Sequence, residues 1–391
     1  MASEKGFNGR ITILCGELSG EIHAANLLKN LSKLVSVEFY ALGSSLLRRE
    51  NVKIVYDYKG ISITGLGGVL RKIFPILRAY WAVKKHIKQK RPSVLILVDF
   101  PGLNLFFAKL AKKENIPVVY FIPPQIWAWG RRRIKIIKEC VDLVISFFPF
   151  ERSIYEAYGV RYQFVGHPYV NSLAPSYEKE KFFEEFSIPK GNPIIALFPG
   201  SREEEVKRHM PYFRDLIKRL EELLSHPFFI FAKAQSVDER EIKKYIRSFP
   251  NVRIIENLSK DILFFSDFAI LASGSATLEA ALAGVPSVVI YRLSFISYHV
   301  AKFLVKVPYV SLPNILLGEE IFPEFIQNLD TQKIAVTIRD MLKRDMRKKM
   351  EEHRAKIRSL LTLADGDPYR IASLKIVDLI REKYGSVPEA N

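Results

Sequence analysis

The sequence predicts an α/β protein made of two doubly wound parallel sheets that face each other across a cleft. Two observations carry this prediction. Short runs of β-branched and other apolar residues alternate with helical stretches, which is typical of parallel strands covered by helices on both faces. The length of 391 residues is enough for two domains of ordinary size, each with its own core.

The expected strands are runs of four or five mostly apolar residues. They are Ile11–Cys15, Val37–Ala41, Val94–Val98, Val118–Ile122, Leu143–Ser146, Tyr162–Val165, Ile194–Phe198, Phe228–Phe231, Val252–Ile255, Phe268–Leu271 and Ser287–Tyr291. In such sheets ligands collect at the carboxyl ends of the strands, so we expect the functional residues in the turns that follow them.

The domain boundaries follow from the segments between these runs. The turn Gly166-His167-Pro168 and the polar run 178–191 lie between the two halves. We therefore assign residues 1–170 to an N-terminal domain and residues 171–366 to a C-terminal domain. The pattern is helical from Lys333 onward. The last helix, within residues 367–391, is expected to cross back to the N-terminal domain or to the partner subunit of a homodimer.

The formal net charge of +17 indicates a negatively charged binding partner but does not identify it. Such an excess favours nucleic acid, anionic lipid headgroups or phosphorylated ligands, and it is also typical of thermophile surfaces. Cys15 and Cys140 match no metal or redox spacing, and the histidines lack ligand spacing. We expect a reduced protein of the cytosolic type with no metal site. Residues 1–10 are polar and no long apolar run follows, so neither a signal peptide nor a spanning helix is expected.

A stretch from Lys59 to Val98 has no acidic residue and places basic and apolar residues at helical spacing. This pattern favours a helix on a membrane surface. The alternative is a helix that packs its apolar face on the core and exposes a basic face to water. Pro75 is expected to begin or to break the helix. The candidate membrane or acyl-chain contacts are Val69, Leu70, Ile73, Phe74, Leu77 and Trp81.

Two turns of the second half suit a diphosphate. The segment 272–279 follows an expected strand and opens a helix, where amide groups lie at the positive end of the helix dipole. Its amide-bearing positions are Gly274, Ser275, Ala276 and Thr277. Glu279, one turn further on, is placed to accept hydrogen bonds from sugar hydroxyls. The turn Pro199-Gly200-Ser201-Arg202 offers amides and a guanidinium. Helix capping is the alternative for both turns, and Ser201 and Glu204 have the spacing of a capping box.

Acidic residues follow two strands of the first half. Asp99 ends an apolar strand, where partial desolvation would raise its pKa and suit a general base; the alternative is a turn or helix cap. Glu17 and Ser19 belong to a Gly-Ser turn, in which Glu17 either orients an acceptor hydroxyl or is solvated. For Glu21 either a solvated position or a place in the first helical turn is favoured. Asn314, taken alone, is typical of a turn residue.

Trp127, Trp129 and the arginines 131–133 form an aromatic and basic cluster. Such a cluster either stacks on bases or contacts lipid. The residues around it match no nucleic-acid module, so nucleic acid is not the expected partner.

Taken in order, these motifs resemble the lipid A disaccharide synthase family of inverting, two-domain GT-B glycosyltransferases. The resemblance runs from the first expected strand to about residue 330. The matching segments are Gly16-Glu17-x-Ser19-Gly20, Val98-Asp99-x-Pro101 with Asn104, Pro124-Gln125-x-Trp127-Ala128-Trp129, Phe148-Pro149-Phe150-Glu151, Phe164-Val165-Gly166-His167-Pro168, Leu197-x-Pro199-Gly200-Ser201-Arg202, Ala272-Ser273-Gly274-x-Ala276-Thr277-Leu278-Glu279 and Tyr309-Val310-Ser311-Leu312-Pro313-Asn314.

The resemblance implies transfer of 2,3-diacylglucosamine from UDP-2,3-diacylglucosamine to the 6-hydroxyl of 2,3-diacylglucosamine 1-phosphate. The products are the β-1,6-linked disaccharide 1-phosphate of lipopolysaccharide biosynthesis and UDP. It also implies no cofactor, no metal, and peripheral attachment to anionic phospholipid on the cytoplasmic face of the inner membrane. Asp99 is then the favoured base. Glu17 is a second candidate catalytic residue. The implied substrate contacts are Arg202, Glu279 and the 274–277 backbone, with Ser201, Ser19 and Asn314 as further cleft residues.

Two alternatives stay open on the residues alone. One is another GT-B enzyme, a transferase or epimerase acting on UDP-N-acetylglucosamine. The other is a basic nucleic-acid-binding protein. The family usually has Asp at the position of Glu21, which leaves the role of Glu21 open.

Overall fold

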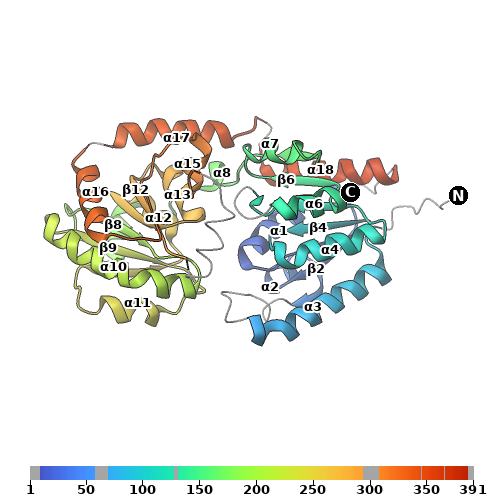
Figure 1. Cartoon of the computed structure of the whole chain (residues 1–391), viewed down its shortest axis with the longest axis horizontal. Helices are drawn as coiled ribbons and strands as arrows, with labels where there is room; N and C mark the ends of the chain where they lie inside the picture. Colours follow the sequence, from blue (N-terminus) through green and yellow to red (C-terminus); the bar gives the residue numbers. More distant parts are fainter. Residues whose placement is uncertain are drawn as a thin grey trace. The chain divides into compact units, whose positions relative to one another are not determined.

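The structure, a computed structural model, describes residues 9–57, 69–126, 131–293, 308–344, 346–364 and 366–385. The chain divides into two compact units. Unit 1 is Met1–Pro168 together with Leu361–Asn391, and unit 2 is Tyr169–Leu360. Each unit contains one parallel sheet with helices packed against it (Figure 1). The C-terminal helix, which starts at Pro368, belongs to unit 1.

Unit 1 has a seven-stranded sheet in the order β3-β2-β1-β4-β5-β6-β7, in which every neighbouring pair is parallel. Its strands are β1 (Arg10–Leu14), β2 (Glu38–Gly43), β3 (Lys53–Asp57), β4 (Val94–Val98), β5 (Val118–Phe121), β6 (Leu143–Ser146) and β7 (Tyr162–Phe164). Its helices are α1 (Leu18–Leu31), α2 (Ser45–Arg48), α3 (Val69–Lys90), α4 (Pro101–Lys113), α6 (Arg131–Cys140), α7 (Glu151–Glu156) and α18 (Pro368–Tyr384).

Helices cover both faces of this sheet. Successive side chains of a strand point to opposite faces, so each strand contributes to two cores. Leu95 and Leu97 of β4 pack in one core with residues of α3, α4 and α6. Val94, Ile96 and Val98 pack in the other with residues of α1 and α18. Burial on both faces explains why the central strands are nearly continuous apolar runs.

Unit 2 has a six-stranded parallel sheet in the order β10-β9-β8-β11-β12-β13. Its strands are β8 (Ile194–Phe198), β9 (Phe228–Lys233), β10 (Val252–Glu256), β11 (Phe268–Ala272), β12 (Ser287–Tyr291) and β13 (Glu324–Ile326). Its helices are α8 (Tyr169–Ser172), α9 (Lys179–Glu185), α10 (Glu203–Leu223), α11 (Glu239–Ile246), α12 (Ser259–Phe264), α13 (Ser275–Ala283), α15 (Leu312–Leu317), α16 (Thr331–Lys343) and α17 (Arg347–Leu361). Residues of α10, α11 and α16 bury one face of the sheet.

All the expected strands are present, within one or two residues at their ends. The structure adds β3 and β13, which the sequence analysis did not contain. Both lie at an edge of their sheet. β3 is mostly half-buried and β13 has three residues, so neither produces the continuous apolar run that marks a central strand.

Helix α3 runs through Pro75, so the expected start or break at this proline is wrong. Beyond the proline, Ala79, Val83 and Ile87 are buried in the core and hold the helix on the sheet. None of the helices among the described residues has the length and apolar character needed to cross a bilayer.

Candidate active site

Each sheet has one point at which its strand order reverses. In unit 1 the chain winds outward from β1 to β3 and then returns to place β4 beside β1. In unit 2 it winds from β8 to β10 and then places β11 beside β8. Turns that follow the two strands at such a point diverge to opposite faces, and ligands of open α/β sheets bind there.

The turns after β1 and β4 pack directly on each other at the switch point of unit 1. A Cβ added to Gly16 would lie 2.1 Å from the ring of Phe100, so the ring rests on the backbone of the turn. A Cβ added to Gly20 would lie 3.9 Å from that of Asp99. The structure therefore brings the turn that contains Glu17 and Ser19 to the residue expected to act as the base.

The main chain of Asp99 is held in an unusual conformation. Asp99 and Phe100 both have φ of 46°, in the left-handed region. The carbonyl oxygen of Asp99 accepts hydrogen bonds from Asn104 Nδ2 at 2.7 Å and from the Tyr120 hydroxyl at 2.9 Å. Asn104 is fully buried, and its amide also lies 3.2 Å from the carbonyl oxygen of Val98. These bonds fix the backbone while the Asp99 side chain stays half-buried, as a group that exchanges protons with a substrate requires.

The residues of the β1 turn differ in exposure. Ser19 is exposed and Glu17 is half-buried. Glu17 is the N-cap of α1, but its side chain makes no capping hydrogen bond. The turn thus presents an acid and a hydroxyl at the first turn of a helix, next to Asp99.

Glu21 lies in the first turn of α1, as one of its two expected positions had it, but the expectation that it is solvated is wrong. It is fully buried, and its Oε1 accepts a hydrogen bond from the Ser44 amide at 2.5 Å. Its Oε2 accepts one from the Ser44 hydroxyl at 2.6 Å. Ser44 is the N-cap of α2, so Glu21 ties α1 to the start of α2. It is a structural residue, 23 positions from its partner in the sequence.

The turn after β8 lies at the switch point of unit 2 and leads into α10. The N-cap of this helix is Arg202, so the alternative of a capping box formed by Ser201 and Glu204 is wrong. Ser201 is exposed, and its carbonyl oxygen accepts a hydrogen bond from the Ser236 hydroxyl at 2.6 Å. The Arg202 side chain is half-exposed, with Nη1 3.6 Å from Glu205 Oε1. The guanidinium is therefore at the surface at the N-terminus of α10, where a diphosphate can reach it.

The turn after β11 lies beside it and opens α13. Gly274 is the N-cap, and nothing lies within 4 Å of the position that its Cβ would occupy. Gly274 and Ser275 are exposed, and Ala276 is half-buried. Thr277 is fully buried and its hydroxyl donates to the Gly274 carbonyl at 2.8 Å, so its side chain stabilises the turn. The turn therefore presents accessible backbone at the positive end of a helix, where an anion can bind.

Glu279 is on the buried side of α13, with 9% of its surface exposed. Burial raises the pKa of its carboxyl above the ordinary value, and hydrogen bonds from Tyr169 and Ser259 act against that rise. The Ser259 hydroxyl is 3.3 Å from Glu279 Oε2. Glu279 is thus a desolvated carboxyl group one turn from Gly274.

Asn314 has no hydrogen bond left for a ligand, which removes it from the expected substrate contacts. Its Nδ2 donates to the Phe322 carbonyl at 2.8 Å and to Glu324 Oε1 at 2.9 Å. Its Oδ1 accepts from the amides of Ile321 and Phe322, both at 3.0 Å. These four bonds use the full capacity of a side-chain amide. Asn314 is fully buried and holds α15 to the segment before β13.

The helix α3 combines the two roles that the sequence left as alternatives. Ala79 and Val83 pack in the core, whereas Phe74, Leu77 and Trp81 are 71%, 46% and 59% exposed. Lys84 Nζ lies 4.4 Å from the centre of the Trp81 ring. The side chains of Val69, Leu70 and Ile73, and the residues Trp127 and Trp129, lie outside the described part of the chain.

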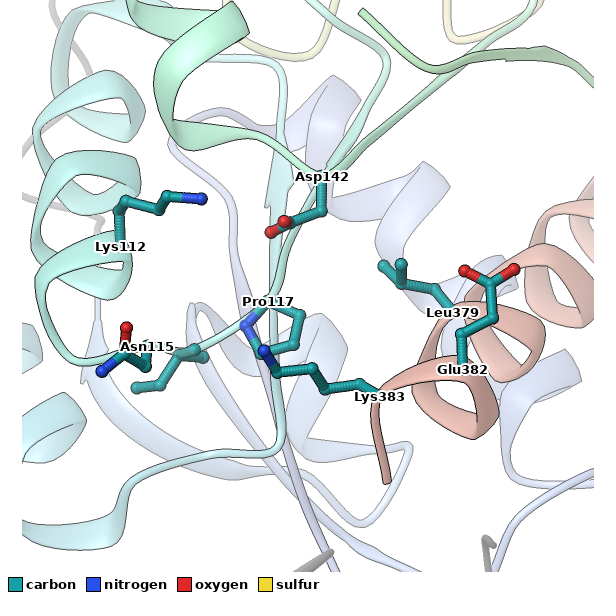
Figure 2. A pocket seen from close by; sticks show the side chains of 8 residues that line it. Lys112, Asn115, Pro117, Asp142, Leu379, Glu382 and Lys383 are labelled. Atoms are coloured by element: carbon teal, nitrogen blue, oxygen red, sulfur yellow. The ribbon is translucent and has the colours of Figure 1, made fainter. Parts of the chain in front are cut away.

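The described residues contain no cluster of three His, Cys, Asp or Glu side chains placed to hold a metal ion. They do contain a cavity of about 280 Å³ in unit 1, which Figure 2 shows from close by. Lys112, Pro117, Asp142 and Lys383 contribute to its lining. Pro117 and Asp142 each directly precede a strand, so the cavity is at the amino edge of the sheet, opposite the switch-point turns.

The β8 turn is held by a group of residues that were not predicted from the sequence. His209 of α10 is fully buried and contacts the ends of both β8 and β12. Its signal in the sequence is a histidine on the apolar face formed by Val206, Met210 and Phe213. That pattern indicates a buried histidine but not its partners, which come from distant strands.

Two doubly wound parallel-sheet units of this kind define the GT-B class, a fold shared by glycosyltransferases and nucleotide-sugar epimerases. Residues 11–367 match the model of the lipid-A-disaccharide synthetase family, and the chain belongs to this family. The fold and the family both agree with the resemblance seen in the motifs. Because the chain belongs to this family, the alternative interpretations as an epimerase or as a nucleic-acid-binding protein are not favoured.

Named relatives support the assignment over most of the chain. A lipid-A-disaccharide synthase 1 of Legionella pneumophila is 38% identical over 323 residues, which are 81% of this chain and 84% of that protein. A lipid-A-disaccharide synthase of Nitrosococcus oceani is 33% identical and covers 96% of this chain and 97% of its own length.

Solved structures show the same fold at low sequence identity. The UDP-GlcNAc 2-epimerase of Neisseria meningitidis bound to UDP-GlcNAc is 14% identical with a TM-score of 0.60, over 95% of this chain and all of that one. The S. aureus MnaA–UDP structure is 14% identical with a TM-score of 0.62, over 97% and 98% of the two chains.

Proposed function

We propose that this chain transfers 2,3-diacylglucosamine from UDP-2,3-diacylglucosamine to the 6-hydroxyl of 2,3-diacylglucosamine 1-phosphate, with inversion. Membership of the lipid-A-disaccharide synthase family makes the chain a glycosyltransferase of lipid A biosynthesis and implies these acylated substrates. The products are the β-1,6-linked disaccharide 1-phosphate and UDP.

Asp99 is the general base in this proposal. The bond between O6 of the acceptor and C1 of the donor forms as the bond from C1 to the β-phosphate oxygen breaks. The O6 proton passes to the Asp99 carboxylate, and the electron pair of the broken bond leaves with UDP. The observation that carries this assignment is the half-buried acid at the switch point of unit 1, on a main chain held by Asn104 and Tyr120.

UDP is held by unit 2. The half-exposed guanidinium of Arg202 and the accessible backbone from Gly274 to Ala276 supply positive charge and N–H donors to the diphosphate, while Thr277 stabilises the turn through its bonds to the Gly274 carbonyl. Ser201 and Ser275, both exposed, are the adjacent hydroxyls, and Glu279 accepts hydrogen bonds from the ribose. These groups can stabilise the negative charge of the leaving UDP. We therefore propose that transfer needs neither metal nor cofactor. Full activity in excess EDTA is the expected result, and loss that Mg²⁺ restores would refute it.

The defining experiment is incubation with both acylated substrates and detection of the disaccharide 1-phosphate by mass spectrometry. A non-acylated UDP-N-acetylglucosamine serves as the competing donor. Disaccharide formed from the acylated pair supports the proposal. Equal use of the non-acylated donor would instead favour a different UDP-sugar transferase.

We further propose that the protein attaches peripherally to the cytoplasmic face of the inner membrane through α3. Exposed Phe74, Leu77 and Trp81 lie on a helix rich in Lys and Arg, which suits anionic phospholipid. Replacing all three by Ser should reduce co-sedimentation with phosphatidylglycerol vesicles. The matched control is Leu374→Ser, at an apolar residue of α18 that is 39% exposed. Unchanged sedimentation of the triple variant would place the membrane contact elsewhere.

A further inference from the structure

His209 joins two strand ends of unit 2 by hydrogen bonds from both of its ring nitrogens. Its Nδ1 lies 2.7 Å from the carbonyl oxygen of Pro199, the residue that directly follows β8. The amide of Arg292, directly after β12, lies 3.1 Å from Nε2. In the sheet β11 separates β8 from β12, so the imidazole spans the strand that leads into Gly274.

The two partners determine the protonation state that the imidazole must have. A proline carbonyl can only accept, so Nδ1 carries the proton and donates. An amide N–H can only donate, so Nε2 accepts. Only the neutral Nδ1–H tautomer makes both bonds. Burial lowers the pKa of His209 below the ordinary value, which favours this neutral form.

Two neighbouring residues of α10 strengthen the same connection. Arg208 Nη1 donates to the Arg292 carbonyl at 3.2 Å, and the Tyr291 hydroxyl donates to Glu205 Oε1 at 3.2 Å. Glu205 also packs on the β8 turn. A Cβ added to Gly200 would lie 2.9 Å from the Cβ of Glu205. We call Glu205, Arg208 and His209 the α10 clamp.

We propose that His209 is a positioning residue for the diphosphate of the donor. Through the bond to Pro199 it fixes the start of the turn Gly200-Ser201-Arg202, whose amides and guanidinium receive the diphosphate. The inference rests on the proposed function of that turn. His209 itself is buried beneath the turn and acts through it.

The two hydrogen bonds can be removed separately. His209→Asn puts an amide nitrogen near the place of Nδ1 and should keep the bond to Pro199. His209→Gln puts a carbonyl oxygen near the place of Nε2 and should keep the bond from Arg292. His209→Leu should make neither bond. The measurement is UDP affinity by calorimetry, at a temperature well below the melting temperature of every variant.

We expect His209→Leu and His209→Gln to weaken UDP binding on the order of tenfold, and His209→Asn to stay within about threefold of the wild type. The control His353→Leu removes another buried histidine of unit 2, on α17, and should lower the melting temperature without changing UDP affinity. Equal UDP affinity in all folded variants would overturn the inference, and so would equal losses for Asn and Gln. Absence of UDP binding by the wild type would instead refute the proposed function.

A second measurement covers the case in which His209→Leu does not fold. In the wild type labelled with ¹⁵N-histidine, UDP should shift the Nδ1 resonance of His209, assigned by its absence from His209→Asn. If the Nδ1 resonance does not shift at saturating UDP, the diphosphate does not bind at the turn that His209 holds, and the inference fails.

Discussion

The substitution Asp99→Asn tests the proposed base with little disturbance of the structure. The change replaces one carboxylate oxygen by an amide group and leaves the main chain intact. This matters because Asp99 has φ of 46°, a conformation that Asn adopts more readily than most residues. The carbonyl bonds from Asn104 and Tyr120 involve the backbone of residue 99 and are kept. We therefore expect the free energy of unfolding to change by less than about 1 kcal/mol.

The expected effect on catalysis is much larger. An amide cannot take the O6 proton, so the general-base contribution is lost. Such a contribution is typically about 10²–10⁴-fold in rate, which corresponds to about 3–5 kcal/mol of activation free energy. UDP affinity should not change, because the proposed diphosphate ligands are all in unit 2.

The assay is single-turnover transfer at saturating concentrations of both substrates, with disaccharide quantified by mass spectrometry and UDP affinity measured by calorimetry. Glu50→Gln is the matched control, since it makes the same chemical change at an exposed acid of unit 1. Normal turnover by Asp99→Asn under these conditions would refute Asp99 as the base. A loss of turnover accompanied by an equal loss in Glu50→Gln would attribute the effect to net charge.

Other perturbations test the donor site, the β1 turn and the buried imidazoles. Arg202→Ala should weaken UDP binding about 10- to 100-fold because a charge-assisted contact to the diphosphate is lost; unchanged calorimetric affinity would contradict the assignment. Glu21→Gln should lower the free energy of unfolding, measured with urea, by about 1–3 kcal/mol, because an amide nitrogen would face the donors of Ser44. Burial lowers the pKa of His23 to about 4, so the unfolded chain takes up a proton near pH 6.5 that the folded chain refuses. His23 alone should therefore contribute a fall in stability of up to about 3 kcal/mol as the pH decreases from about 6.5 to 4, and His23→Gln should remove this share while His86 and His167, whose pKa values burial also lowers, keep theirs.

The central strands and the turns after them could be predicted from the sequence, because both leave local signals. Strands such as β4 are buried on both faces and therefore appear as unbroken apolar runs. The chemically distinctive residues follow these runs directly. The edge strand β3 and the passage of α3 through Pro75 left no such signal, since both depend on packing by the rest of unit 1.

The roles of single polar residues were harder to predict, because a role depends on partners that the fold brings from elsewhere. Glu21 and Asn314 are residue types that are common at surfaces and in ligand sites, yet both are fully buried and hydrogen-bonded to the chain itself. The partner of Glu21 is 23 residues away. The sequence contains the partners, but their proximity follows from strand order, which no local pattern encodes.

Strand order also explains why the exposed candidate residues of unit 2, Ser201, Arg202, Gly274 and Ser275, lie at its switch point. The turn after β8 and the turn after β11 are neighbours because their strands pair in register, with Leu271 opposite Phe198. At such a point the connections depart to opposite faces of the sheet, so backbone groups there lack the covering helices that satisfy them elsewhere. Gly274 is open in this way, whereas Thr277, one turn further along α13, is already buried. From below, the β8 turn is held by the bond from the buried His209 to the Pro199 carbonyl, which is why we expect this side chain to keep the turn in one arrangement before a ligand binds.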